Sequence, residues 1–281
     1  MEEAIDGHTV ILIRVPRADR TVRPVYINED PKRGSYRRNG DGDYHCTQEE
    51  LRAMMRDSAE GATDKLPLPN IELSDLAQET IRTYRTVFDN SRPNHPWSVL
   101  PDEEFLMRLG ALGRSAEDGK VHPTRAGLLM FGQGWRITDE YPDYFLDCRI
   151  VSKGRRWDDR VTSADGDWTG NVYDFYRKAQ EMLSEGLPIP FELDSAMHRM
   201  SDTPQHRAIR EGLVNALVHA DYYGRTGVVA VRHPGGIEIS NPRTLLLPVS
   251  VIEGGGFRSK ESHSVHDVQP HWSERKGGQR L

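Results

Sequence analysis

The order of apolar and polar residues predicts a small sheet with one helix near the N-terminus. A β-branched run and two further short segments are separated by turns that contain Pro, Asp and Gly, which is typical of strands. Thr47 and Glu50 have the spacing of a capping box, which predicts a helix from there to about Arg56. The expected strands cover residues 10–15, 24–28 and 35–38.

Apolar residues spaced three and four apart predict helices through the middle of the chain. Ser74 is expected to cap the first of them. Another helix is expected over 125–131, opened by Thr124, and Asp167 is expected to cap a longer one over 168–185. The apolar face of the first helix consists of Ala77, Ile81, Tyr84 and Phe88.

The following part of the chain mixes strands with one strong helix. A strand is expected over 144–151, and Thr203 followed by proline predicts the start of a helix that runs to about Ala220. Two further strands surround a His-Pro-Gly turn and cover 227–232 and 236–240. Short strands mixed with helices along the whole chain predict an α/β or mixed α+β fold.

Composition adds that the chain is polar and globular. It has 281 residues, of which 28% are charged and 36% hydrophobic, and its net charge is −6. This charge excludes a uniformly basic nucleic-acid coat but allows a local basic patch. No run approaches the ~18 apolar residues of a membrane span, and no secretory signal is recognisable at Met1, so no membrane partner is expected. Cys46 and Cys148 lie far apart, which excludes a disulfide scaffold and suits a cytoplasmic location.

A basic strip lies near the N-terminus. From Arg14 to Arg38 the chain has eight basic residues against three acidic ones, a net charge of +5, with Tyr26 and Tyr36 among them. Such a strip on a sheet and its hairpin suits contacts with phosphates, which dominate nucleic-acid affinity. The alternative is an ordinary solvated surface, and little direct base readout is expected. The candidate nucleic-acid-binding residues are Arg14, Arg17, Arg20, Arg33, Arg37 and Arg38.

A polar stripe interrupts the apolar pattern of the helix expected after Thr203. Glu211, Asn215 and His219 follow one another at intervals of four residues, which places them on one helical face. A solvated face is the simple interpretation. Asn is nevertheless a poor residue for the middle of a helix, and the stripe contains no Lys or Arg. We therefore also interpret the stripe as a candidate binding site.

The stripe resembles a known motif. Glu followed four residues later by Asn is similar to the N-box of the GHKL (Bergerat-fold) ATP-binding proteins. The wider run at 210–222, R-E-G-L-V-N-A-L-V-H-A-D-Y, resembles the divergent GHKL domain of bacterial transcriptional regulators that carry an AlbA-like (Schlafen-core) DNA-binding domain in front. The resemblance covers Val10–Gly255 and also rests on S-Y-R-R-N-G at 35–40, P-T-R-A-G-L-L-M-F-G at 123–132 and W-T-G-N at 168–171.

The resemblance implies roles for individual residues. Glu211 would be the catalytic residue that orients or deprotonates a water, and Asn215 would be the metal ligand that holds Mg²⁺ on the phosphates of ATP. His219 and Asn241 would complete the cofactor-binding site. Asn241 stands where the family has Asp, and Arg243 where it has Gly, so the adenine-binding motif departs from the family pattern. The implied cofactors are ATP and Mg²⁺.

The resemblance also divides the chain into four parts. Residues 1–60 are expected to be the C-terminal half of a truncated AlbA-like sheet domain, and 61–200 a linker and helical middle region. Residues 201–256 are expected to be the N-terminal half of an incomplete GHKL sandwich. The composition of 257–281 predicts a disordered basic tail. Codons that can encode residues 256–281 can also be read one nucleotide later, in a shifted frame. One such translation contains S-D-P-R-N-P and E-R-A-G-S-G, which resemble the next segment of the family. We therefore expect that this tail is translated out of frame.

These observations together predict a bacterial, cytoplasmic, DNA-binding transcriptional regulator with a divergent, degenerate ATP-binding module. DNA is the expected partner, and a homodimer is a further expectation. One alternative is an enzyme, either a weak ATPase or a Schlafen-like nucleic-acid-processing enzyme of the group often filed with ATP-dependent DNA helicases, although this truncated chain is expected to be inactive. No helicase P-loop occurs in the sequence. The other alternative is a non-catalytic assembly module.

Overall fold

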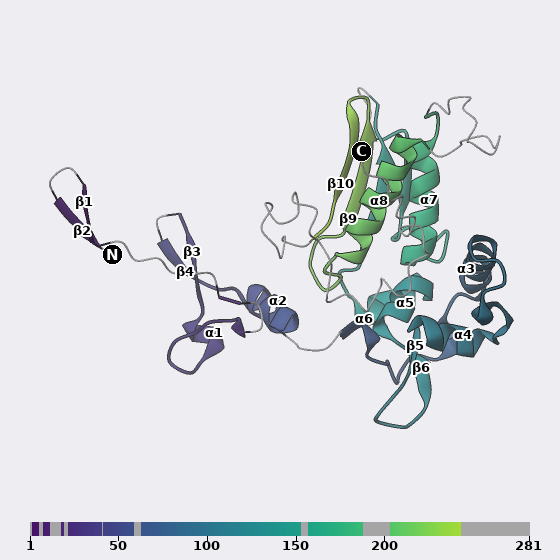
Figure 1. Cartoon of the computed structure of the whole chain (residues 1–281), viewed down its shortest axis with the longest axis horizontal. Helices are drawn as coiled ribbons and strands as arrows, with labels where there is room; N and C mark the ends of the chain where they lie inside the picture. Colours follow the sequence, from purple (N-terminus) through teal and green to yellow (C-terminus); the bar gives the residue numbers. More distant parts are fainter. Residues whose placement is uncertain are drawn as a thin grey trace, which may run out of the picture. The chain divides into compact units, whose positions relative to one another are not determined.

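The computed structural model describes residues 2–5, 8–11, 18–19, 22–40, 42–58, 63–152, 157–187 and 203–242. The chain divides into two compact units, Met1–Thr63 and Asp64–Leu281 (Figure 1). The tail expected over 257–281 lies outside the described residues.

The described residues of the first unit form two hairpins and two helices. β1 pairs antiparallel with β2, and β3 pairs antiparallel with β4. Leu51 and Cys46 are buried in this unit. The elements are β1 (Glu2–Ile5), β2 (His8–Ile11), α1 (Pro31–Gly34), β3 (Tyr36–Asn39), β4 (Gly42–His45) and α2 (Gln48–Ser58).

Residues 24–28 do not form the strand expected from the sequence, and that prediction was wrong. Only Tyr26 makes an isolated bridge, to Ser35. Asn28 and Glu29 have φ angles of 57° and 58°, a left-handed conformation that an extended strand cannot contain. The chain therefore turns here and enters α1 instead of pairing along β3.

The capping box at the start of α2 is confirmed. The N–H of Glu50 donates to Oγ1 of Thr47 at 3.2 Å, and the N–H of Thr47 donates to the carboxylate of Glu50 at 2.8 Å. The strand expected over 35–38 is confirmed as β3. β2 includes the first residues of the strand expected over 10–15 and ends at Ile11, and residues 12–15 lie outside the described part.

The second unit combines helices with a sheet and a small hairpin. The helices are α3 (Gln78–Ser91), α4 (Asp102–Leu109), α5 (Arg125–Phe131), α6 (Gly134–Glu140), α7 (Val172–Ser184) and α8 (Pro204–Val218). The strands are β5 (Leu112–Arg114), β6 (Val121–Pro123), β7 (Leu146–Ile150), β8 (Asp159–Thr162), β9 (Val228–His233) and β10 (Gly236–Ser240). Short 3-10 turns are η2 (Thr63–Lys65), η3 (Leu73–Asp75) and η4 (Pro96–Val99).

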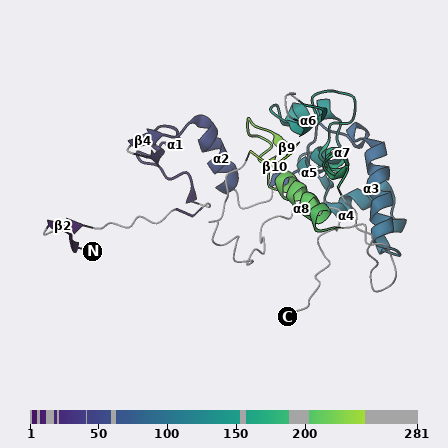
Figure 2. The same ribbon diagram turned by 90° about the horizontal axis from the view of Figure 1, so that it is seen from above.

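A four-stranded sheet with the order β10-β9-β7-β8 forms one layer of this unit. β7 and β9 run parallel, and the two outer pairs run antiparallel. α7 and α8 pack against each other and against the sheet (Figure 2). On the covered face Leu146, Cys148, Val228 and Ala230 are at most 1% exposed. Helices packed on a mixed sheet confirm the predicted α+β class.

An aromatic cluster joins the helices of the second unit. The ring of Tyr84 on α3 meets the rings of Phe131 and Tyr173 edge to face, with centroids 5.4 and 5.1 Å apart. Phe105 on α4 completes the cluster and is fully buried, as is Phe131. Edge-to-face pairs of this kind each add about 0.5–1.5 kcal/mol beyond the burial of their area. α3, α4, α5 and α7 thus share one core.

Ser74 is not the cap of α3, and that prediction was wrong. α3 begins at Gln78, and Ser74 lies within η3. The N–H of Ala77 donates to the carbonyl of Phe131 at 2.6 Å, and the residue before it bridges to Gly132. This extended pairing holds the chain out of helical conformation until Gln78.

Asp167 is not the cap of α7 either, because the helix begins at Val172. Gly170 has a φ of +75°, which turns the chain after Asp167. The cap is Asn171, whose side-chain oxygen accepts a hydrogen bond from the N–H of Asp174 at 2.8 Å. The buried side chain of Asn171, and not the exposed Asp167, therefore caps α7.

The other helix starts follow the sequence. Thr124 caps α5 by accepting from the N–H of Gly127 at 3.0 Å, and Thr203 caps α8 by accepting from the N–H of His206 at 3.4 Å. The strand expected over 144–151 is confirmed as β7, with narrower bounds. None of the helices that the structure describes is long and apolar enough to cross a bilayer.

The sheet joins parts of the chain that the sequence assigns to different domains. β7 and β8 belong to the expected middle region 61–200, and β9 and β10 to the expected GHKL part 201–256, yet β7 and β9 pair directly. The boundary between the compact units lies at Thr63, close to the one expected at residue 60. The AlbA-like and GHKL assignments of these parts stay predictions.

Candidate functional site

The hairpin β3–β4 presents aromatic and basic side chains on both of its faces. In its register Tyr36 lies opposite His45, and Arg37 lies opposite Tyr44. Every residue of β3 is exposed, as are Tyr44 and His45. Gly40 has a φ of +59° at the turn, a conformation that glycine adopts without strain. The hairpin is therefore a two-sided solvent-facing element.

The two arginines of the hairpin point in opposite directions. Successive side chains of a strand alternate between its faces, so Arg37 shares one face with Tyr44, and Arg38 shares the other with Tyr36 and His45. The rings of Tyr36 and His45 lie 4.2 Å apart at an angle of 34°. Each face thus combines one arginine with a flat aromatic surface.

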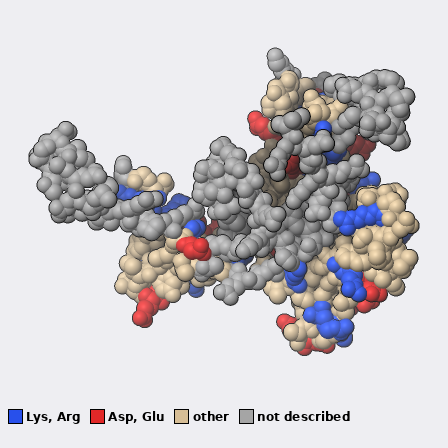
Figure 3. Space-filling model, in the orientation of Figure 1, with Lys and Arg blue, Asp and Glu red and all other residues tan. Residues whose placement is uncertain are grey.

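Acidic side chains pair with the arginines in the free protein. Arg37 forms an ion pair with Glu50 of α2, Arg38 with Asp43 at 3.2 Å, and Arg33 with Asp30 at 3.9 Å. Figure 3 shows basic and acidic side chains close together on the side of the first unit that faces the viewer. All three arginine side chains are at least half exposed, and such pairs contribute about 0–1 kcal/mol. A phosphate can replace these carboxylates at little cost.

The carboxylate of Glu50 also belongs to the cap of α2. The pKa of Glu50 is lowered, first by the backbone N–H of Thr47 and then by the hydroxyl of Thr47 and by Arg37. Glu50 therefore stays ionised near neutral pH and holds Arg37 beside the helix.

The rest of the predicted basic strip is partly beyond the described residues. Arg14, Arg17 and Arg20 lie outside them. Arg23 donates its Nε–H to the carbonyl of Ala18 at 2.9 Å, so part of its guanidinium is engaged with the backbone. Arg33, Arg37 and Arg38 are the predicted residues that the structure places at the surface. Sequence reasoning missed Tyr44 and His45, although their alternation opposite the arginines was a usable signal.

The predicted amphipathic character of α8 is confirmed. Glu211 and Asn215 are exposed on its outer face. The N–H of His219, at the C-terminal cap, donates to the carbonyl of Asn215 at 3.1 Å. The opposite face is buried and consists of Ile209, Leu213, Ala216 and Leu217. Glu211 and Asn215 thus share an open helical face.

Asn241 lies beside the end of α8. Its side-chain NH₂ donates to the carbonyl of Ala216 at 3.3 Å, so the amide satisfies one of the terminal carbonyls of the helix. The structure therefore brings Asn241 close to the Asn215 end of α8, and it gives the amide of Asn241 a structural hydrogen bond there.

A hollow lies at the other end of α8, beside Gln205, Ala208 and Ile209. Its volume is about 910 Å³, and none of Glu211, Asn215, His219 and Asn241 lines it. The described part of the chain also holds no group of three or more His, Cys, Asp or Glu residues suited to a metal ion. The residues that line the hollow include Gln205, Ala208, Ile209, Arg232, Ile237 and Ile239.

The donor set on α8 fits Mg²⁺ and ATP incompletely. Mg²⁺ bound to phosphates needs one or two protein oxygens, and the amide oxygen of Asn215 supplies one on an open face. The hollow at the other end of the helix does not include that face.

The tyrosines after α8 anchor the helix to the core of the unit. The hydroxyl of Tyr223 donates to the carboxylate of Glu140, which also accepts from Nε of Arg125 at 2.9 Å. The hydroxyl of Tyr222 donates to the carbonyl of Leu217 at 2.7 Å. Tyr222, the last residue of the run that carries the resemblance, thus has a structural role here.

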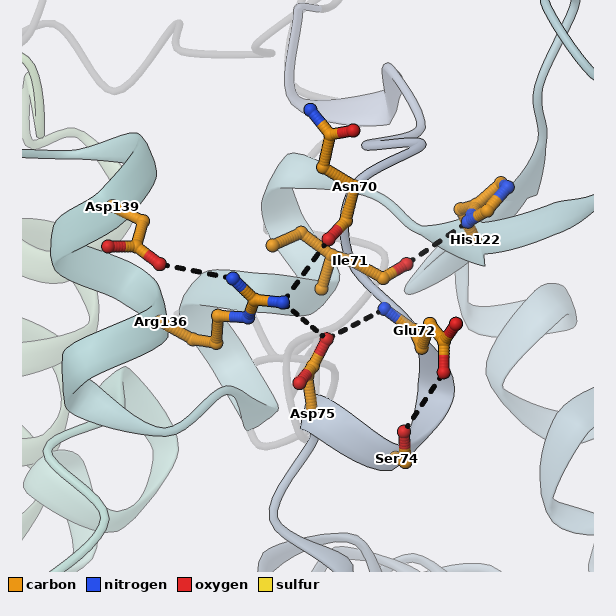
Figure 4. A network of polar contacts seen from close by, with 8 residues as sticks. All are labelled: Asn70, Ile71, Glu72, Ser74, Asp75, His122, Arg136 and Asp139. Carbon is orange, nitrogen blue, oxygen red and sulfur yellow. Dashed lines mark hydrogen bonds and ion pairs between the residues drawn. The ribbon is translucent and has the colours of Figure 1, made fainter.

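A polar network holds the segment before α3 in place (Figure 4). The guanidinium of Arg136 on α6 donates to the carbonyl of Asn70 at 3.3 Å and to the carboxylate of Asp75 at 3.2 Å. The same guanidinium donates to Asp139 at 3.2 Å. η3 and the residues before it are thereby tied to α6.

His122 holds the same segment from the other side. Its Nδ1 lies 3.0 Å from the carbonyl oxygen of Ile71, and its Nε2 lies 2.8 Å from the carboxylate of Asp118. Both partners only accept hydrogen bonds, so the buried imidazole satisfies both when both nitrogens carry a proton. Asp118 first, and then the carbonyl of Ile71, raise the pKa of His122.

The comparisons with known proteins name no activity. A model of a domain of unknown function, DUF8451, matches residues 52–147, from α2 to the start of β7. A comparison with curated proteins gives no match. Among solved structures, the crystal structure of the DIP2311 protein from Corynebacterium diphtheriae is similar, with a TM-score of 0.46 and 18% identity. The likeness covers 77% of this chain, which spans 40% of the length of that chain.

Proposed function

We propose that the protein binds DNA through the β3–β4 hairpin and acts as a bacterial transcriptional regulator. The observation that supports DNA binding is the exposure of the hairpin on both faces, each with one arginine and at least one aromatic ring. The regulatory role rests on the resemblance alone.

The charge arrangement supports phosphate contacts in particular. Arg37 and Arg38 belong to exposed ion pairs that contribute little to stability. A DNA backbone offers a dense row of phosphates, and displacing its counterions drives binding at low salt. The arginines therefore exchange intramolecular carboxylates for phosphates when DNA approaches.

The cellular setting is proposed from the cysteines. Cys46 and Cys148 are both free thiols and both buried. Free thiols persist in a reducing compartment, which supports a location in the bacterial cytoplasm.

The proposal is tested with paired arginine variants of the full chain. Arg37→Ala combined with Arg38→Ala should weaken binding of a labelled duplex by at least tenfold at low salt, measured by fluorescence anisotropy. The matched control is Arg82→Ala with Arg108→Ala, which removes the same charge from two exposed ion pairs of the second unit. An equal loss of DNA affinity in both double variants would mean that net charge alone, and not the hairpin, explains the effect. Absence of DNA binding by the wild type would refute the function and leave the assembly role.

Nucleotide binding by α8 is a second candidate function. It is favoured by Glu211 and Asn215, which lie one turn apart on the exposed face of an uninterrupted helix. Mg-ATP should then raise the melting temperature, and Asn215→Ala should abolish the rise. Asn90→Ala is the control, because Asn90 is also exposed on a helix. No stabilisation of the wild type would exclude this candidate.

A further inference from the structure

We infer that the hairpin takes single-stranded DNA, with bases stacked on its aromatic rings. This inference rests on the proposed function and names the ligand class of the same site. It is carried by the positions of Tyr44, Tyr36 and His45 on β3 and β4.

The ring of Tyr44 lies along the hairpin instead of standing away from it. A Cβ added to Gly42 would lie 3.0, 3.1 and 3.2 Å from Cε2, Cζ and the hydroxyl oxygen of Tyr44. The outer part of the ring thus covers the backbone of Gly42, two residues earlier on the same face. Tyr44 is nevertheless 55% exposed. A flat aromatic surface supported from below and open above is the geometry that base stacking requires.

The opposite face of the hairpin has a second aromatic surface. Tyr36 is 46% exposed, and its ring lies 4.2 Å from that of His45 across the strand pair. The contact between the two rings restricts their rotation. A base that stacks on Tyr36 therefore meets a ring that is already ordered.

An arginine accompanies the aromatic surface on each face. Arg37 lies directly opposite Tyr44, and Arg38 lies two residues from Tyr36 on the same strand face. Each face thus offers stacking for a base and a cation for the adjoining phosphate.

The arrangement favours a single strand over a duplex. In a duplex the base faces are stacked on one another and are closed to protein rings, whereas an unpaired strand exposes them. Duplex DNA can therefore contact only the arginines of this hairpin, through its phosphates. Because each stacked base contributes roughly a tenfold gain in affinity, the single strand should bind at least about tenfold more tightly than a duplex of equal length.

The test compares two ligands and three proteins. Full-length wild type, Tyr44→Leu and Tyr44→Phe are titrated into a labelled strand of about 16 thymidines and into a duplex of the same length. The wild type should prefer the single strand at least about tenfold. Tyr44→Leu should lower this preference several-fold and leave the part that Tyr36 contributes, and Tyr44→Phe should keep it, because phenylalanine retains the ring. Tyr36→Leu should lower it as well, through the other face.

The outcomes separate this inference from the proposed function. If the wild type binds both ligands equally and Tyr44→Leu leaves their ratio unchanged, the stacking inference is overturned while DNA binding stands. If neither ligand binds, the proposed function fails first. Tyr44 is exposed, so circular dichroism of Tyr44→Leu should match the wild type, and a loss of preference then reports the ring itself.

Discussion

A Cβ at residue 42 would lie 3.0 Å from Cε2 of Tyr44, so the ring of Tyr44 occupies the space that a side chain at Gly42 would need. Glycine at this place lets the ring rest on the strand. The aromatic surface of the hairpin thus depends on a residue that makes no side-chain contact of its own.

Gly42→Ala should displace the ring of Tyr44 while leaving the unit folded. The clash is with the far end of a flexible, exposed side chain, which can move. We expect a change in stability of less than about 1 kcal/mol and a several-fold weaker affinity for single-stranded DNA, measured by anisotropy. An unchanged affinity, with the same circular dichroism, would show that the position of the ring is unimportant.

Glu50→Gln should strengthen DNA binding. The substitution removes the carboxylate that pairs with Arg37, and glutamine keeps the capping box of α2. Since an exposed ion pair contributes about 0.2–1 kcal/mol, affinity should rise roughly one and a half- to fivefold. Glu103→Gln on α4 controls for net charge. An equal rise in both variants would mean that Arg37 is not a contact.

The pair formed by His122 and Asp118 makes stability depend on pH. The pKa of His122 is raised in the folded state, first by Asp118 and then by the carbonyl of Ile71. Its contribution is therefore complete below about pH 6.5, the ordinary value, and is lost as the pH rises through the folded-state pKa. The pKa of Asp118 is lowered, first by His122, so its contribution is lost only as the pH falls through that lowered value.

The measurement is the fall in melting temperature between about pH 6 and pH 8.5. The fall should be smaller in Asp118→Asn than in the wild type, because the variant lacks the charge that favours the imidazolium. Asp139→Asn should behave like the wild type, since its partner Arg136 does not titrate in this range. Identical falls in all three proteins would contradict the assignment of His122 as the titrating group.

Two glycines in helices of the second unit should respond in opposite ways to alanine. At Gly127 on α5 a Cβ would lie 1.9 Å from the carbonyl oxygen of Ala111, so the backbone itself must move. Gly127→Ala should cost about 3 kcal/mol or prevent folding. At Gly212 on α8 the nearest atom is Cδ1 of Ile239 at 3.1 Å, the flexible end of a side chain.

Gly212→Ala should be close to neutral or stabilising. Alanine gains about 1 kcal/mol over glycine in a helix, which offsets a small shift of Ile239. Chemical denaturation of both variants checks the pair. A stability loss at Gly212→Ala as large as that at Gly127→Ala would mean that α8 approaches β10 as closely as α5 approaches the chain at Ala111.

Local signals in the sequence predicted much of the fold. Thr47, Thr124 and Thr203 cap their helices as expected, because a cap needs only the residues of the next turn. The caps predicted at Ser74 and Asp167 were wrong, because a tertiary pairing decides the first of these helix starts and a turn of the backbone decides the second. Pairing of the preceding chain with the end of α5 delays α3, and the turn at Gly170 delays α7.

The candidate site was only partly predictable. Alternation along a strand already implies that Arg37 and Arg38 face opposite sides. The register that sets Tyr44 opposite Arg37, and the ion pair between Arg37 and Glu50, depend on how the hairpin meets α2. The hydrogen bond from Asn241 to Ala216 joins residues far apart in the chain, and no local pattern indicates it.

DNA binding by the β3–β4 hairpin is tested most directly by the salt dependence of its affinity. The binding constant of the full chain for a labelled single strand is measured from about 50 to 200 mM salt, for the wild type and for the variant with Arg37→Ala and Arg38→Ala. We predict that affinity falls as salt rises, and that losing two phosphate contacts makes the logarithmic slope shallower by about 1.4. No binding at low salt, or the same slope in both proteins, would contradict the assignment of the hairpin as the DNA-binding surface.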